Sequence, residues 1–179
     1  MSDGRLIPPV SERDHTAGAA DAPVTLVEYG DYECPHCGRA YPIIKAIQQR
    51  LGERLRFVFR NFPLKEAHPH AEHAAQAAEA AAEAGKFWEM HDTLFEHQNA
   101  LDDQSLARYA EAVGAGAGRI EAALAEQTYS RRVREDFLSG VRSGVNGTPT
   151  FFINGARYDG PWDEDDLVDA LEAGAAATG

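Results

Sequence analysis

The sequence predicts an α/β fold that is interrupted by a long, all-helical segment. Three observations carry this prediction: a strand, a helix and a strand follow one another over residues 24–61, helix-forming segments fill about 70–143, and two short strands and a helix close the chain. A succession of strand, helix and strand in about 40 residues is typical of a βαβ unit. A chain of 179 residues accommodates one such domain with an insertion.

Residues 1–22 are expected to form a tail or irregular lead-in, because prolines, glycines and small polar residues outweigh periodic apolar ones. The folded domain is then expected to start near Pro23. A β-branched and apolar run over 24–29 predicts the first strand. Apolar residues at three- and four-residue intervals over 41–51 predict a helix, and alternating apolar residues over 55–61 predict a second strand.

The middle of the chain is predicted to be helical. Residues 70–84 are rich in alanine and have high helix propensity. Apolar residues at helical spacing recur over 87–95, 106–113 and 129–141. We therefore expect several consecutive helices between about 70 and 143.

The carboxyl end returns to mixed structure. Two short runs, 150–153 and 156–159, flank the pair Asn154-Gly155, which predicts a β-hairpin. Residues 163–171 begin with acidic side chains and continue with apolar residues at helical spacing, which predicts a last helix.

Charge and composition exclude several classes of protein. The chain has 17 basic and 29 acidic residues and a formal net charge of −12. This balance argues against a general nucleic-acid binder or a protein of anionic membrane surfaces. No stretch approaches the ~18 consecutive apolar residues of a membrane helix, and the first residues lack the apolar stretch of a secretory signal. We expect a cytoplasmic protein with no membrane span, or an exported one only if a signal was removed.

Cys34 and Cys37 are the chain's two cysteines and its strongest chemical signal. A disulfide framework needs more cysteines, spread more widely. The pair falls where the first strand ends and the first helix begins, and unsatisfied N–H groups at a helix start favour a thiolate over a thiol. Residues three apart are neighbours on a helix, so the two cysteines can close a short disulfide. We expect Cys34 to be the nucleophile and Cys37 the resolving thiol.

The residues around the pair suit this chemistry. Pro35 fits an early helical position, since its missing N–H has no intrahelical partner there. His36 can add positive charge or a hydrogen bond beside the sulfur. A negative charge on Glu33 would oppose thiolate formation unless this side chain points into solvent.

Glu28 lies in an otherwise apolar strand, six residues before Cys34. Strand alternation places it on one face with Val24 and Leu26. A buried carboxyl holds its proton more tightly than an exposed one, which would suit proton exchange with Cys37. The alternative is a glutamate at a strand end in water.

Two other interpretations of the cysteines stay open. A CxxC pair also occurs in structural zinc sites, which need four ligands, so histidines would have to complete the set. The other interpretation is a pair of buried apolar thiols. We expect no metal, because the clustered histidines fit solvated or helix-start positions after Pro69, which opens a helix. These histidines are His68, His70 and His73. His91, on the face of Phe87, Leu94 and Phe95, fits a packing position. Phe87 and Trp88 are expected in the core, and a place in a substrate cleft of the helical insertion is the alternative.

Three motifs taken together resemble the DsbA-like thioredoxin-fold family. They are VEYGDYECPHC over 27–37, RNFPL over 60–64 with HPHA over 68–71, and GTPTFFING over 147–155. The likeness covers about residues 20–173. It implies a thioredoxin fold, over 23–63 and 144–179, with an inserted all-helical domain over 64–143.

The resemblance also implies an activity and further site residues. The Thr148-Pro149 bond is expected to be cis and to pack beside Cys34, where Thr148 would bind substrate as a short strand, although the base rate for proline alone favours trans. Glu28 matches the family's buried acid and would serve Cys37.

The implied function is a thiol-disulfide oxidoreductase that acts on protein or peptide thiols and disulfides. It would use no cofactor, and an unidentified redox partner would reset the cysteine pair. The direction of exchange is not fixed. The alternative is a redox-regulated peptide-binding module on the same scaffold.

Overall fold

The computed structural model describes residues 3–178, and these divide into two compact units. The first unit contains residues up to 30, 39–60 and those from 138 onward, and the second contains 31–38 and 61–137. Each unit is therefore assembled from segments that lie far apart in the sequence.

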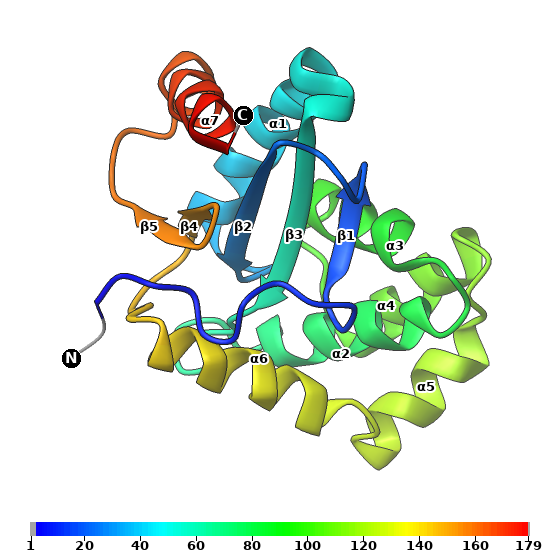
Figure 1. Ribbon diagram of the computed structural model, residues 1–179. Helices are drawn as coiled ribbons and strands as arrows, with labels where there is room; N and C mark the ends of the chain where they lie inside the picture. The colour runs from blue at the N-terminus through cyan, green and yellow to red at the C-terminus, as the bar shows by residue number, and fades with distance from the viewer. Residues whose placement is uncertain (1–2, 179) are drawn as a thin grey trace. The chain divides into compact units, whose positions relative to one another are not determined.

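Five strands form one sheet in the order β1-β3-β2-β4-β5 (Figure 1). β2 is buried along its whole length, as its apolar sequence predicts. Its antiparallel pairing with β4 sets Tyr29 opposite Thr150. Pro149 immediately precedes β4, so it lies at the carboxyl end of β2. Cys34 follows β2 in the sequence. The strands are β1 (His15–Gly18), β2 (Val24–Gly30), β3 (Leu55–Asn61), β4 (Thr150–Ile153) and β5 (Ala156–Tyr158).

Over its described residues, 3–22, the lead-in is more ordered than the sequence predicts. Residues 15–18 form the edge strand β1, which pairs antiparallel with β3 and sets His15 opposite Phe59. Leu6, further upstream, is buried. β1 is held by backbone pairing and not by a buried face. Such a strand needs no apolar alternation, and the short sequence of β1 has none.

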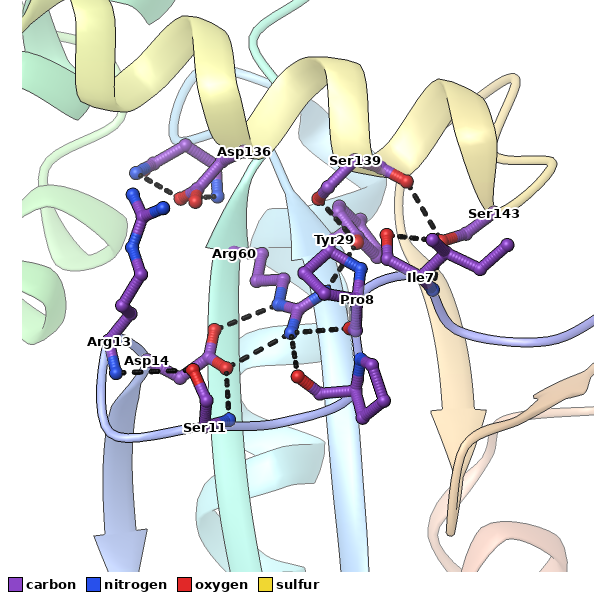
Figure 2. Close-up of polar contacts among 12 residues, drawn as sticks. Ile7, Pro8, Ser11, Arg13, Asp14, Tyr29, Arg60, Asp136, Ser139 and Ser143 are labelled. Carbon is purple, nitrogen blue, oxygen red and sulfur yellow. Dashed lines mark hydrogen bonds and ion pairs between the residues drawn. The ribbon is translucent and has the colours of Figure 1, made fainter.

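Arg60, near the end of β3, holds this lead-in on the first unit (Figure 2). Its Nε donates to Oδ1 of Asp14 at 2.8 Å, and its Nη2 donates to Oδ2 of Asp14 and to the carbonyl of Pro8, each at 3.0 Å. Its Nη1 donates to the hydroxyl of Tyr29 at 2.9 Å, and that hydroxyl also bonds with Ser139. One buried guanidinium thus joins the lead-in, two strands and the segment after 138.

Helices α2 to α5 build much of the second unit (Figure 1). α2 contacts α3, α4 and α5, and its buried face consists largely of alanine, so the neighbouring helices can approach closely. The helical middle of the chain is confirmed. The helices are α1 (Pro35–Leu51), α2 (Ala71–Ala82), α3 (Phe87–Glu96), α4 (Asp103–Ala112), α5 (Ala117–Glu126), α6 (Ser130–Arg142) and α7 (Glu164–Thr178), with a 3₁₀ turn at Gly52–Arg54.

The predicted last helix, α7, packs on β2 and β4 in the first unit. Gly174 lies so close to this sheet that a Cβ there would meet Ile153 at 3.0 Å and Val24 at 3.3 Å. Within residues 3–178, no helix has the length and apolar character needed to cross a membrane.

Candidate active site

Cys34 is the residue immediately before α1, and Cys37 lies in the first turn of that helix. The carbonyl of Cys34 accepts a hydrogen bond from the backbone N of Gly38 at 3.0 Å, which makes Cys34 the N-cap residue. Pro35 opens the helix and, like His36, is exposed, whereas both cysteines are buried thiols. The expected position of the pair at a helix start is confirmed.

Asp31 fixes the turn that carries Cys34. Its Oδ1 accepts hydrogen bonds from the backbone N of Glu33 at 2.7 Å and of Cys34 at 3.2 Å. Its Oδ2 accepts from the backbone N of Leu64 at 2.9 Å and faces Nδ1 of His68 at 2.8 Å. These partners compensate for the complete burial of the carboxylate. Asp31 was not among the site residues predicted from the sequence, although an aspartate shortly before a helix is a signal for capping.

His68 is partly buried against Asp31. Since an ionised carboxylate only accepts hydrogen bonds, Nδ1 carries the hydrogen. Burial lowers the pKa of His68, but the hydrogen bond to Asp31 and the charges of Asp31, Cys34 and Glu33 together raise it above its ordinary value of 6.5. A larger share of His68 is therefore protonated at neutral pH than of an ordinary histidine.

Glu33 is bound by the histidine that precedes α2. Its Oε1 accepts from the backbone N of His70, and its Oε2 faces Nδ1 of the same residue, both at 2.8 Å. The negative charge before Cys34 is thus paired with an imidazole. His73 bonds with Asp103 at 2.6 Å, so each histidine of the cluster has a different carboxylate partner. In the part of the chain that the structure describes, no three His, Cys, Asp or Glu side chains gather as metal ligands.

Gln98, in the segment after α3, binds the backbone of the cysteine turn. Its Nε2 donates to the carbonyls of Tyr32 and Cys34, each at 2.9 Å. Gly38 leaves room for this side chain, because a Cβ there would collide with Oε1 of Gln98. Gln98 was not predicted as a site residue, since no local pattern links an isolated glutamine to a turn far upstream.

An aromatic cluster supports the same turn. The hydroxyl of Tyr32 bonds with Nδ1 of His91 at 2.9 Å, and the Tyr32 ring lies 4.9 Å from that of Phe95, centroid to centroid. His91 also contacts the rings of Phe87 and Trp88. His91 is buried among these rings, which confirms the prediction that it is a packing residue.

Glu28, Thr148 and Pro149 belong to the first unit, whereas the cysteines belong to the second. Glu28 is buried in β2 opposite Phe151, and its Oε2 lies 2.8 Å from where a Cβ on Gly30 would be. The Thr148-Pro149 bond is cis, which confirms what the family resemblance implied. The packing of Pro149 beside Cys34 stays a prediction.

Comparison with known proteins agrees with this architecture. A family model described as Thioredoxin matches residues 10–173. The oxidised form of BdbD from Bacillus subtilis superposes with a TM-score of 0.85 at 25% identity, covering 98% of each chain. A double-substituted variant of alpha-DsbA1 from Wolbachia pipientis superposes with a TM-score of 0.84 at 18% identity, covering 99% of this chain and 98% of the other. The predicted thioredoxin fold of the DsbA-like type is confirmed.

One curated relative that matches this chain is named as a different kind of protein and is much longer. The Na(+)/H(+) antiporter NhaA 1 of Mycobacterium sp. (strain KMS) is 46% identical over 172 residues, which cover 94% of this chain and 28% of that relative. The chain thus spans less than a third of the length of this relative.

Proposed function

Because this chain belongs to the thioredoxin family, we propose that it is a thiol-disulfide oxidoreductase that exchanges disulfides with protein or peptide thiols through Cys34 and Cys37. The observation that carries the proposal is the position of Cys34 as N-cap of α1, with Cys37 in the following turn. A helix start stabilises a thiolate, and the thiolate is the attacking and leaving form of cysteine.

The exchange proceeds through a mixed disulfide. In the oxidising direction, a substrate thiolate attacks Sγ of Cys34 in the Cys34–Cys37 disulfide. A bond forms between the substrate sulfur and Cys34, the bond to Cys37 breaks, and Cys37 leaves as a thiolate that takes up a proton. A second substrate thiolate attacks the first substrate sulfur and releases Cys34 as a thiolate. The substrate loses two electrons and the cysteine pair gains two.

Other residues have roles in this proposal. Glu28, a buried carboxyl, exchanges the proton of Cys37. Thr148 and Pro149, at the amino end of β4, bind the substrate backbone as a short strand. His36, exposed in the first turn of α1, supplies an imidazole that can add a hydrogen bond or positive charge beside Cys34. Pro35 stiffens the same turn.

We propose the oxidising direction. A stabilised Cys34 thiolate favours the reduced protein, and a protein with a favoured reduced form is a strong oxidant of its substrates. Equilibration with glutathione tests this: a potential near the DsbA end of the scale is expected, and one near thioredoxin would reverse the direction. A separate redox partner must then reoxidise the pair. The cytoplasmic location stays a prediction, which cell fractionation tests. The location bears on the direction of exchange, because cytosolic thiols are normally kept reduced.

The activity is tested with the two cysteines separately. Cys34→Ser should abolish the dithiothreitol-dependent reduction of insulin, whereas Cys37→Ser should accumulate mixed disulfides that gel electrophoresis resolves under non-reducing conditions. Thermal unfolding of both variants controls for loss of the fold. Full turnover by folded Cys34→Ser would overturn the assignment.

A redox-regulated binding module is the second candidate function. One observation favours it: the matched region covers only 28% of a relative named as a sodium/proton antiporter. In this candidate, the oxidation state of Cys34 and Cys37 governs the affinity for a peptide segment, with Pro149 at the binding site. Slow exchange with glutathione, together with a peptide affinity that differs between the oxidised and reduced forms, would favour the module over the enzyme.

A further inference from the structure

One buried carboxylate joins the backbone of Cys34 to an imidazole ring. Oδ1 of Asp31 accepts from the N of Cys34 at 3.2 Å, and Oδ2 of the same group binds Nδ1 of His68 at 2.8 Å. We propose that His68 is a positioning residue of the exchange reaction, which stabilises the Cys34 thiolate by its positive charge and by orienting Asp31. This inference rests on the proposed thiol-disulfide exchange.

The negative charges around Cys34 require a positively charged group that offsets them. Asp31 and Glu33 are acidic residues at the start of α1, and negative charge near a thiol disfavours its thiolate. Each carboxylate is paired with one histidine, His68 or His70. The His68 side chain is 19% exposed, whereas that of His70 is 46% exposed. Since water and salt screen exposed charges more than buried ones, His68 has the larger effect.

The interaction between His68 and Cys34 is reciprocal. The titratable groups that act on His68 are Asp31, Cys34 and Glu33, all from the turn before α1, and each raises its pKa against the lowering effect of burial. If a negative Cys34 favours the protonated ring, the protonated ring favours a negative Cys34 by the same free energy. Loss of the ring's charge must therefore weaken the thiolate.

The proton balance of the reaction includes His68. Two glutathione thiols reduce the Cys34–Cys37 disulfide, supply two electrons and form one glutathione disulfide. They also bring two protons. One proton stays on Cys37, and the other goes to His68 where the ring is neutral, or to solvent where the ring is already charged. Cys34 remains a thiolate.

The variant His68→Asn separates charge from hydrogen bonding. An asparagine Nδ2 takes the place of the ring Nδ1 and donates to Asp31, but it carries no charge. We expect the equilibrium constant for reduction by glutathione to fall about tenfold, since one pKa unit on the thiol corresponds to a factor of ten. The matched control His70→Asn, at the more exposed pair, should change this constant less than about threefold. Equal effects of both variants, or none from His68→Asn, would overturn the proposal.

A second measurement leaves His68 in place. The pKa of His68 is followed by NMR in the reduced protein and in the variant Cys34→Ser. It should be higher in the reduced protein, because only there does Cys34 carry a charge, whereas a purely structural histidine would titrate alike in both.

The two proposals fail in different ways. If the cysteines turn over substrate but neither the glutathione equilibrium nor the NMR titration responds, only the role of His68 is refuted. If folded Cys34→Ser retains turnover, the proposed function itself is refuted.

Discussion

Nδ1 of His68 lies 2.8 Å from Oδ2 of Asp31, a carboxylate with no exposed surface that is 37 positions away in the sequence. The same Oδ2 accepts from the backbone N of Leu64. The segment after β3 is thus attached to the turn before α1 by two hydrogen bonds. The motif around the cysteines and the histidine-rich motif are therefore parts of one local structure.

This pair predicts that stability depends on pH. The pKa of His68 is raised in the folded protein, so the positive charge of its ring stabilises the fold fully below the ordinary value of 6.5, and this contribution is lost as the pH rises through the raised value. Urea unfolding measures the effect in a background with Cys34→Ser and Cys37→Ser, which removes thiol titration. The loss of stability caused by His68→Asn should be largest below about pH 6.5 and should shrink as the pH rises further. A loss that is constant with pH would contradict this.

The contact between Gly38 and Gln98 predicts that Gly38→Ala destabilises the protein when Gln98 is present and stabilises it when Gln98 is removed. A double-mutant cycle measures this change of sign. Gly38→Ala displaces the Gln98 side chain, which binds two carbonyls, at about 1 kcal/mol for each lost hydrogen bond. In a Gln98→Ala background the same substitution should stabilise by about 0.5–1 kcal/mol, because alanine favours a helix over glycine. Gly118→Ala is the control, since nothing lies within 4 Å of a Cβ on that α5 glycine, and it should stabilise in both backgrounds. Chemical denaturation gives the four free energies. Stabilisation by Gly38→Ala alone would contradict the role of Gln98.

Some elements of the fold can be predicted from their own residues, and others form only by pairing with a distant part of the chain. β2 is buried throughout, and α2 has high helix propensity, so both can be predicted from their own residues. β1 cannot, because its residues show no apolar alternation and it forms only by pairing with β3.

The candidate site likewise has features that the sequence predicts and features that it does not. The position of Cys34 before a helix is a local property and follows from the sequence. The partners of the turn do not, because Gln98 reaches Cys34 across 64 positions and His68 reaches Asp31 across 37. Asp31 lies between these cases, since its capping of Cys34 is local although its bond to His68 is not.

The Arg60–Asp14 ion pair predicts that the amino-terminal lead-in contributes to stability. Burial lowers the pKa of Arg60, but its bonds to Asp14 and Tyr29 outweigh this effect and raise it, so the guanidinium stays charged. The side chains of Arg60 and Asp14 are 3% and 6% exposed. Removing one partner of a buried pair costs about 3–5 kcal/mol, which is the loss expected for Asp14→Ala in urea unfolding.

An exposed pair in the same lead-in is the control for this prediction. Asp3 and Arg5 form an ion pair whose side chains are 69% and 76% exposed. Asp3→Ala should change the free energy of unfolding by less than about 0.5 kcal/mol. Equal losses in the two variants would show that the burial of Arg60 does not matter.

The alanine face of α2 predicts a strict limit on side-chain size in the second unit. Ala77 is fully buried, and α2 contacts three other helices. Extra methyl groups in a filled core force side chains and backbone to shift, so Ala77→Leu should cost about 1–3 kcal/mol in urea unfolding. Ala122→Leu, at an exposed position of α5, should change stability by less than about 0.5 kcal/mol. If Ala77→Leu stabilised the protein, the added leucine would be filling space, and the close approach of these helices would not depend on alanine.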